Sequence, residues 1–436
     1  MKILLINPWI YDFAAYDFWI RPLGLLYVAA ELESDGHTVQ LIDCLADYTA
    51  AKKFGTHVIR SERIEKPAAL VHVPRYYKRY GISIAAFQKQ VAQAGKPDYI
   101  GITSMMTYWY PGIVEVIRQC RDIYPEVPLV LGGVYATLCA EHSQELFPGV
   151  KLVTGRGIGR VHEFFGKQAG KLSGQPDRFF NHMPAYHLYK QPFETAAVIT
   201  SIGCPFHCSY CAGPLLQPAF EQNSVEAVLA EIKQYVEEHH VADLAFYDDA
   251  LFVRNEAHVK PILRGIIAAG WQIRFHTPNG LHIRYLDEEL AHLLYQAKVR
   301  TIRLSFESVD PGRQRDSSSK TTAADLERAV TVLMSAGYTS RDLSAYVLAG
   351  LPGQPLAEVQ QSIDFVHSLG IPVSLAEYSP VPGTLDFTKA LQYEPRLAAE
   401  PLLQNCSVFP LSQYDFDDYN AFKTKNADIN RKLCAS

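Results

Sequence analysis

The sequence of 436 residues lacks the features that mark membrane proteins, secreted proteins and nucleic-acid-binding proteins. It has no apolar run near the roughly 20 residues that cross a bilayer. Its start, MKILLINPW, has neither the long apolar region nor the cleavage site of a signal peptide. The net charge is −5, with no basic block that would follow a phosphate backbone. We therefore expect a cytoplasmic globular protein that has no membrane span and does not bind nucleic acid.

Cysteine is scarce as well, with eight residues in the chain. In a reducing compartment these do not make a disulfide framework, and clustered cysteines indicate metal binding. Five are isolated and are expected to pack as small hydrophobic residues: Cys44, Cys120, Cys139, Cys406 and Cys434. The other three gather in SIGCPFHCSYCAG (201–213), which is the most informative stretch of the sequence.

The first part of the chain alternates between strand and helix patterns. Short apolar runs typical of buried parallel strands occur at 2–6, 38–43, 98–102, 128–133 and 151–154. Helical patterns separate most of them, and together they predict an α/β domain with a doubly wound, flavodoxin-like parallel sheet. We assign residues 1–167 to this domain, with an insertion at 44–82.

A second alternating series follows a linker at 168–192. Its apolar runs lie near 197–201, 243–248, 271–276, 301–306, 343–349 and 373–378, and the first five each precede a helical pattern. Ser224 and Asp287 are the expected N-caps of two of these helices. Six such units predict a partial (βα)6 TIM-like barrel over 193–385, whose site lies at the carboxyl ends of the strands. Residues 386–436 are interpreted as a C-terminal extension.

Cys204, Cys208 and Cys211 have the spacing Cys-x3-Cys-x2-Cys. Three thiolates from one tight loop hold three irons of a [4Fe–4S] cluster and leave the fourth iron open for a substrate or cofactor. Structural zinc is the alternative, but it needs a fourth ligand, usually from a second cysteine pair. The sequence has no such pair, and His207 lies within the same loop. The ligand count therefore favours the iron–sulfur cluster.

This loop resembles the signature of the radical S-adenosylmethionine (SAM) enzymes. The surrounding motifs resemble the branch with an N-terminal cobalamin (B12)-binding-like domain. In the barrel these are LAFYDDALF (244–252), HTPNGLHIRYLD (276–287), TIRLSFES (301–308), LAGLPGQ (348–354) and LAEYSPVPGT (375–384). In the first domain they are INPW, RPLGLLY, PDYIGITSM and VLGGVYATL. The resemblance extends to about residue 385.

The resemblance implies a [4Fe–4S] cluster whose open iron binds SAM. One electron, from a donor such as flavodoxin or ferredoxin, cleaves SAM to a 5′-deoxyadenosyl radical, which abstracts hydrogen from a small-molecule substrate. The SAM contacts it implies are Tyr210 for the adenine, Asp248 and Asp249 for the amino group, and Glu307, Gly350 and Leu351 for the ribose or adenine. For Asp248 and Asp249, capping of the next helix is the alternative.

Cobalamin is the further cofactor that the resemblance implies, with C-methylation as the reaction. Its candidate contacts are Asn7, Ser104, Gly132, Gly133, Tyr135 and Thr137, at the strand ends of the first domain. The chain departs from the family, since it has no Asp-x-His-x-x-Gly element and reads GRGIGR at 155–160 in place of an acidic Gly-Glu pattern. A sheet that only covers the barrel is therefore the alternative for this domain.

Three other functions remain open on the sequence. One is a cobalamin-independent radical SAM rearrangement, cyclisation or oxidation. Another is a non-catalytic corrinoid- or cluster-binding protein, against which the SAM motifs argue. A methylthiotransferase is the weakest, because it needs a second three-cysteine cluster. No residue is assigned as a catalytic acid, base or radical relay.

Overall fold

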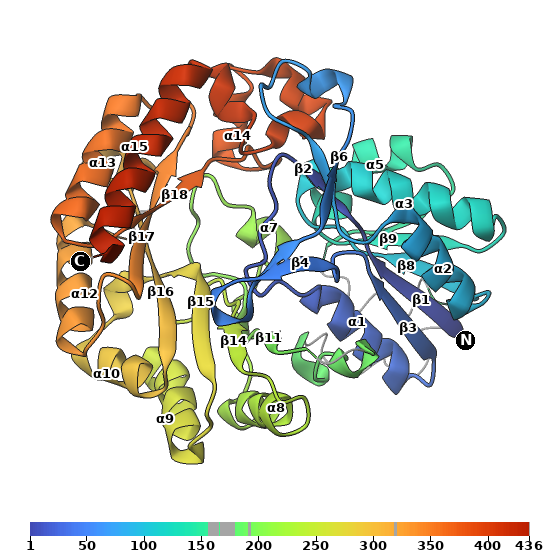
Figure 1. Ribbon diagram of the computed structural model, residues 1–436, viewed down its shortest axis with the longest axis horizontal. Coiled ribbons are helices and arrows are strands. Elements are labelled where there is room, and N and C mark those ends of the chain that lie inside the picture. The colour runs from blue at the N-terminus through green and yellow to red at the C-terminus, as the bar shows by residue number, and fades with distance from the viewer. Residues whose placement is uncertain (156–164, 166–178, 191–192, 318–320, 436) are drawn as a thin grey trace. The chain divides into compact units, whose positions relative to one another are not determined.

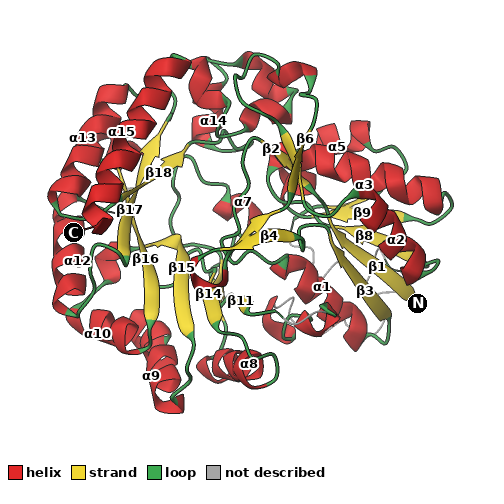
Figure 2. Ribbon diagram, in the orientation of Figure 1, coloured by secondary structure: helices red, strands yellow, loops and turns green. Residues whose placement is uncertain are grey.

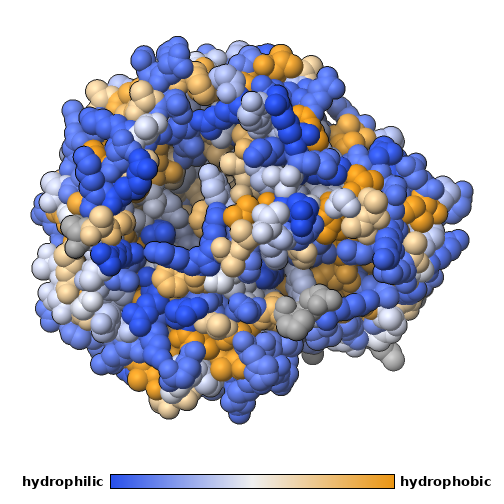
Figure 3. Space-filling model, in the orientation of Figure 1, coloured by the Kyte–Doolittle hydropathy of each residue, from blue (hydrophilic) through white to orange (hydrophobic). Residues whose placement is uncertain are grey.

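The computed structural model describes residues 1–155, 165, 179–190, 193–317 and 321–435. The chain forms two compact units (Figure 1). The first comprises residues 1–192 and 396–405, and the second comprises 193–395 and 406–436. Every helix among the described residues is too short or too polar to span a bilayer. The face shown in Figure 3 is mainly hydrophilic, with hydrophobic side chains scattered over it.

A five-stranded parallel sheet forms the centre of the first unit. Its order is β10–β9–β8–β1–β3. The strands are β1 (Lys2–Asn7), β3 (Thr38–Asp43), β8 (Tyr99–Ile102), β9 (Leu129–Gly132) and β10 (Lys151–Val153). The chain order reverses between β1 and β8, which is the topological switch point of a doubly wound sheet. The predicted flavodoxin-like domain is confirmed.

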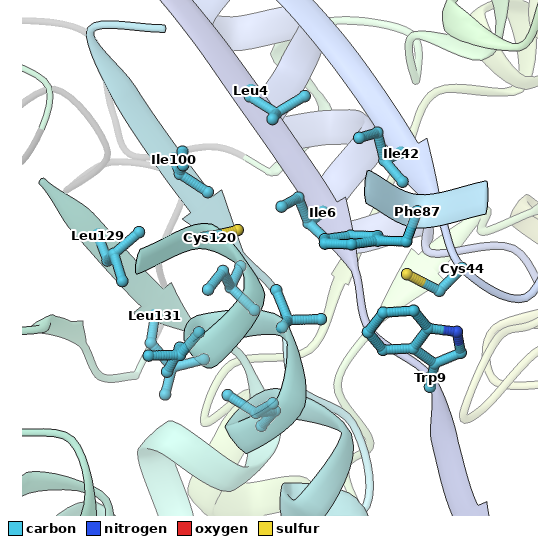
Figure 4. Close-up of a cluster of buried hydrophobic side chains, with 14 of the residues drawn as sticks. Leu4, Ile6, Trp9, Ile42, Cys44, Phe87, Ile100, Cys120, Leu129 and Leu131 are labelled. Atoms are coloured by element: carbon cyan, nitrogen blue, oxygen red, sulfur yellow. The ribbon is translucent and has the colours of Figure 1, made fainter. Parts of the chain in front are cut away.

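Helices cover both faces of this sheet. Successive strand residues point to opposite faces, so each strand contributes side chains to both sides. The helices are α1 (Leu23–Ser34), α2 (Ile84–Ala94), α3 (Tyr110–Ile123), α4 (Val134–Leu138) and α5 (Ala140–Leu146). On β1, Leu4 and Ile6 pack in one hydrophobic core together with Phe87 of α2 (Figure 4). Ile3 and Leu5 pack in a second core on the other face.

Cys44 and Cys120 belong to the first of these cores (Figure 4), as does Cys139. Burial raises the pKa of Cys120 and that of Cys139 to about 12. These thiols stay protonated near neutral pH and act as small hydrophobic groups, as the sequence predicts. Cys406 is half-buried and Cys434 is exposed, so the prediction is wrong for Cys434.

The insertion at 44–82 forms small antiparallel sheets, which the sequence patterns did not indicate. Strand β4 (Tyr48–Ala51) pairs with β5 (His57–Ile59). A second sheet has the order β2–β7–β6, from β2 (Ile10–Asp12), β6 (Ser61–Arg63) and β7 (Lys78–Tyr80). These strands have three or four residues, too short to show an alternating pattern.

Residues 396–405 return to the first unit from far along the sequence. The 3-10 helix η10 (Pro401–Gln404) packs against η3 (Thr107–Trp109). Asn405 Nδ2 donates to Asp12 Oδ1 at 2.8 Å, and Tyr110 OH donates to Glu400 Oε1 at 3.1 Å. Part of the predicted C-terminal extension is therefore built into the first unit.

The second unit is an open six-stranded parallel sheet flanked by helices (Figure 2). Its order is β11–β14–β15–β16–β17–β18. The strands are β11 (Thr195–Val198), β14 (Asp243–Phe246), β15 (Arg274–Leu281), β16 (Val299–Glu307), β17 (Leu343–Ala349) and β18 (Val373–Glu377). The predicted partial (βα)6 barrel is confirmed, with β11 and β18 as its edges.

Helices connect these strands, and two of them have N-caps that the sequence predicts. They are α8 (Val225–Glu237), α9 (Val259–Ala269), α10 (Glu288–Gln296), α12 (Ala323–Ser335) and α13 (Leu356–Ser368), with the shorter α7 (Gly213–Leu216) and α11 (Pro311–Ser317). Ser224 accepts a hydrogen bond from Ala227 N, and Asp287 accepts one from Leu290 N. Both predicted N-caps are confirmed.

The edge strand β18 is covered by α15 (Phe416–Ala435). The Asn430 side chain donates to Val373 O at 2.8 Å and accepts from Val373 N at 2.9 Å, as a neighbouring strand would. Lys423 pairs with Glu377 at 2.9 Å. The helix therefore satisfies an edge that is otherwise open to pairing. Its sequence is polar over most of its length, so its periodicity is weak.

Candidate active site

The three-cysteine loop follows β12 (Ser201–Ile202), which pairs with β13 (Glu221–Gln222). Gly203 opens the loop with φ +75°, in the left-handed region. A Cβ at this position would lie 2.4 Å from Ala219 O. Glycine is therefore required there on two grounds, conformation and close approach. The chain turns sharply, and all three cysteines follow within the next eight residues.

Ser209 anchors the loop between the second and third cysteines. Its backbone N–H donates to Ser317 O at 2.7 Å, and its carbonyl accepts from Asp386 N at 3.0 Å. Its hydroxyl donates to Asp386 Oδ2 at 2.7 Å. Because Ser209 is buried, these bonds fix the adjacent Cys208 and Tyr210 in place.

The thiols themselves lie near the surface of the unit. Cys204 and Cys208 are partly exposed and Cys211 is exposed. Gly213 N–H donates to Cys211 Sγ at 3.3 Å, which favours a thiolate and adjusts the potential of a cluster. Cys204 Sγ lies 4.0 Å from His282 Nε2. The His282 ring stacks on Phe206, with centroids 4.8 Å apart.

The donor set fits an iron–sulfur cluster better than zinc. Within the described ranges, no group of three or more His, Cys, Asp or Glu side chains is arranged around one point as a single ion requires. A cube needs a different arrangement, because each of three irons takes one thiolate. His207, the local candidate for a fourth zinc ligand, is exposed. The three thiols on one anchored loop fit the group that the sequence predicts.

The structure brings Tyr210 and Glu307 together. Tyr210 OH donates to Glu307 Oε1, and Glu307 is buried at the carboxyl end of β16. Glu307 has φ +77°, and a register shift separates it from Ser305 in the pairing with β17. A left-handed conformation is costly for a residue other than glycine and often marks a functional position. Burial, Glu307 and Cys208 together raise the pKa of Tyr210.

Asp248 is engaged by the chain itself. It accepts from Thr200 Oγ1 and from Ser201 Oγ, each at 2.6 Å, and from Thr200 N. His258 Nε2 lies 2.9 Å from Thr200 Oγ1 and extends the network. Burial raises the pKa of Asp248, and its hydrogen bonds oppose the shift. Asp248 thus ties the end of β14 to the segment that leads into the cysteine loop.

Asp249, in contrast, is exposed. Desolvation by the surrounding protein and the charge of the neighbouring Asp248 raise the pKa of Asp249 to about 6. The capping alternative for these two carboxylates is wrong, because α9 begins at Val259, with His258 as its N-cap.

Asn279 and His282 are site residues that sequence reasoning did not single out. Asn279 Nδ2 donates to Tyr247 O at 3.0 Å and to Asp248 O at 3.2 Å, which holds the turn that carries Asp249. Both residues lie within HTPNGLHIRYLD, so the motif marked the segment without assigning roles inside it.

Gly350 and Leu351 lie in the turn after β17. Gly350 has φ +86°, and a Cβ on it would lie 2.9 Å from Pro410 Cγ. Its carbonyl accepts from Gln413 Nε2 at 3.1 Å, and Leu351 is buried. This turn is therefore packed beneath the C-terminal segment, a contact that the sequence did not indicate.

The candidate cobalamin residues of the first unit lie at its strand ends but bond mainly to one another. Ser104 Oγ donates to Gly132 O at 2.7 Å and accepts from Ala136 N at 3.2 Å. Gly133 has φ +98°, and a Cβ there would lie 2.3 Å from Ser104 O. Because Gly133 has no side chain, the backbone of Ser104 can pass close to it.

The other side chains of this set are also engaged. Thr137 Oγ1 donates to Gly133 O at 2.8 Å and accepts from Gly155 N at 3.0 Å. Tyr135 is fully buried, with its hydroxyl 2.6 Å from His142 Nδ1. Asn7 Nδ2 donates to Asp43 Oδ1 at 2.7 Å.

A small hollow of about 20 Å³ lies at the switch point of the first sheet. It is lined by Asn7, Pro8, Trp9, Ile10, Leu45, Thr103, Ser104, Met105, Met106, Trp109 and Ile113. This volume suits a water molecule, so a large ligand would lie across its mouth. The hollow is nevertheless at the edge where doubly wound sheets bind ligands.

Comparisons with known proteins agree with this architecture. Residues 198–366 match the model of the Radical SAM superfamily. The chain is similar to cytidylyl-2-hydroxyethylphosphonate methyltransferase of Streptomyces wedmorensis, with 22% identity over 88% of this chain and 80% of the relative.

Two solved proteins have a similar fold. The radical SAM methyltransferase TsrM from Kitasatospora setae has a TM-score of 0.66 and 17% identity, over 90% of this chain and 76% of that one. A second structure of TsrM contains cobalamin and a [4Fe–4S] cluster. OxsB, a cobalamin-dependent SAM radical enzyme, has a TM-score of 0.58 and 13% identity, over 92% and 56% of the two chains.

Proposed function

We propose that the chain is a radical SAM enzyme that cleaves SAM at a [4Fe–4S] cluster and methylates a small-molecule substrate with the help of cobalamin. The observation that carries this proposal is the anchored three-cysteine loop beside the Tyr210–Glu307 pair, whose carboxylate is buried. Both lie at the carboxyl ends of the barrel strands, where such folds build their sites.

The chemistry comes from the bound groups. A reduced cluster supplies the electron that splits SAM into methionine and a 5′-deoxyadenosyl radical, and cobalamin supplies a methyl carrier. Cys204, Cys208 and Cys211 would each hold one iron, and the fourth iron would take the amino and carboxylate groups of SAM. The chain contributes position and shielding, because Ser209 fixes the loop on both sides.

Asp249 is the better candidate than Asp248 for the SAM amino group. The carboxylate of Asp248 already accepts from Thr200 and Ser201. Asp249 is exposed beside it, and Asn279 holds the turn on which it stands. A cationic ammonium near Asp249 would offset the desolvation and the repulsion from Asp248 that raise its pKa.

Tyr210 and Glu307 would bind the nucleoside part of SAM. Their hydrogen bond orients both side chains, so that the Tyr210 ring offers a face to adenine and the second Glu307 oxygen an acceptor to the ribose. Gly350 and Leu351 would complete the wall, on a turn that Gln413 holds.

Cobalamin would bind at the mouth of the hollow in the first unit. Asn7 and Ser104 line the hollow, and Ser104 donates to Gly132 O in the turn at Gly132–Gly133. Gly132 is partly exposed in this turn. Tyr135 and Thr137 would support this turn from within. The similarity in fold to TsrM, which binds cobalamin, adds to the argument.

A cobalamin-independent radical SAM reaction is the second candidate. It is favoured by the internal hydrogen bonds of Ser104 and Thr137, which leave these hydroxyls less able to serve a ligand. For either reaction we propose a small-molecule substrate, a cytoplasmic location and an electron donor such as flavodoxin or ferredoxin.

Anaerobic purification with metal and corrinoid analysis tests the proposal. We expect about four irons per chain, cobalt near stoichiometry after reconstitution with hydroxocobalamin, and 5′-deoxyadenosine when SAM and dithionite are added. Iron and 5′-deoxyadenosine without cobalt would favour the second candidate. Absence of 5′-deoxyadenosine from protein with a full cluster would indicate a carrier and overturn both.

A further inference from the structure

Arg303 lies in the middle of β16 and faces the barrel lumen. Ile302, its neighbour, is fully buried on the helix side, whereas Arg303 shares the face of Ser305. In the sheet it stands opposite Ser344 of β17, and its Nη1 donates to Ser344 Oγ at 2.9 Å. The guanidinium is therefore inside the barrel, four residues before Glu307.

This cation has no carboxylate partner within ion-pair distance among the described residues. Of its five N–H groups, one donates to a hydroxyl in that part of the chain. Asp243 of β14 does not neutralise it, because Arg274 and His276 already take the Asp243 oxygens. Burial lowers the pKa of Arg303. A half-buried cation without an anion is costly, because part of its hydration is lost, so the position suits an anion from outside.

The walls around Arg303 are polar and uncharged. Ser344 Oγ lies 2.8 Å from Ser374 Oγ of β18, so the two hydroxyls form a pair. Tyr346 is next on the same face of β17, and its hydroxyl donates to Pro278 O at 2.7 Å. The Tyr346 proton is used by Pro278 O, but one proton of the Ser344–Ser374 pair can be donated to an oxyanion, without the repulsion that a carboxylate would bring.

We propose that Arg303 binds an oxyanion group, a carboxylate or a phosphate, at the end of the substrate distant from SAM. This rests on the proposed function. Glu307 lies four positions after Arg303, about 13 Å along a regular strand. A small acid of that length reaches from the guanidinium to the SAM site. The planar fork of arginine matches two oxygens at once, which fixes the orientation of the substrate.

Thermal unfolding of the reconstituted full chain tests this, with sodium phosphate and sodium acetate as probes against sodium chloride at constant ionic strength. We expect the wild-type Tm to rise with concentration for one or both oxyanions, by mass action on the folded state. Arg303→Gln should weaken the apparent affinity at least tenfold. Arg300→Gln, on the opposite face of the same strand, should retain it.

Two outcomes overturn the proposal: equal Tm shifts in wild type and Arg303→Gln, or no shift with either anion in wild type. If Arg303→Gln does not fold, Arg303→Lys replaces it. That variant keeps the charge without the fork and should weaken binding several-fold, and unchanged binding would count against the site. Cleavage of SAM by wild type is measured separately, so its failure would overturn the proposed function and not the anion result.

Discussion

The two units place polar residues at the carboxyl ends of parallel strands, yet they use them differently. In the barrel, Tyr210 and Glu307 meet each other, and Asp249 stays exposed. In the first unit, Ser104 and Thr137 bond to the neighbouring turn. Position at a strand end therefore does not by itself make a binding residue. The difference is whether the local backbone has already used the side chain.

Loss of a proposed cluster thiol should have the largest effect. It tests whether the barrel unit binds the iron–sulfur cluster. Cys208→Ala removes one of the three proposed iron ligands on an anchored loop. We expect iron content to fall to background and 5′-deoxyadenosine formation to fall more than 100-fold, since the chemistry depends on the cluster. Iron assay and chromatography of the products measure this. Cys434→Ala, an exposed isolated cysteine, is the matched control and should keep both.

Glu307→Gln should have the next effect, on SAM binding. The substitution keeps the shape but removes the charge that strengthens its hydrogen bonds, worth about 1.5–3 kcal/mol or roughly ten- to hundredfold in Kd. Equilibrium binding of SAM to reconstituted protein measures it. Glu226→Gln on the exposed side of α8 should bind like wild type. If both variants bind alike, Glu307 has only a structural part in the barrel.

The raised pKa of Asp249 predicts opposite effects of pH on SAM binding and on stability. Its pKa is about 6, above the ordinary value. As the pH falls through 6 it becomes protonated, so affinity for the SAM ammonium should fall. The same raised pKa makes the folded state bind more protons than the unfolded chain. The free energy of unfolding should therefore rise as the pH falls from about 6 toward the ordinary pKa of an aspartate. Asp249→Asn should flatten both profiles near pH 6. A binding profile that keeps its slope in this variant would assign the titration to another group.

Much of this site was predictable because it lies in continuous sequence. The cysteine spacing, the strand ends and the caps Ser224 and Asp287 are all local patterns, and local hydrogen bonds enforce them. The two parallel sheets follow from the same alternation of apolar runs.

What was missed depends on contacts between distant segments. Asn405 reaches Asp12 across 393 positions, and Gln413 reaches Gly350 across 63. Asn279 and His282 have roles only once β15 lies beside the cysteine loop. Helix α15 was not predicted from the sequence. Its contact with the edge of β18 through Asn430 is polar and adds nothing to an apolar pattern.

The smallest expected effect concerns the first unit, where Ser104 lies at a strand end. Ser104→Ala removes an acceptor from the buried Ala136 N–H and a donor from Gly132 O. If Ser104 serves mainly its own unit, the substitution should lower the free energy of unfolding by about 1–3 kcal/mol. SAM cleavage and cobalt content should then change little. Denaturant titration alongside cobalt analysis measures both, with the exposed Ser61→Ala as control. Loss of cobalt from a variant that keeps its stability would mean that the hydroxyl serves a ligand after all, and the two units would then use their strand ends alike.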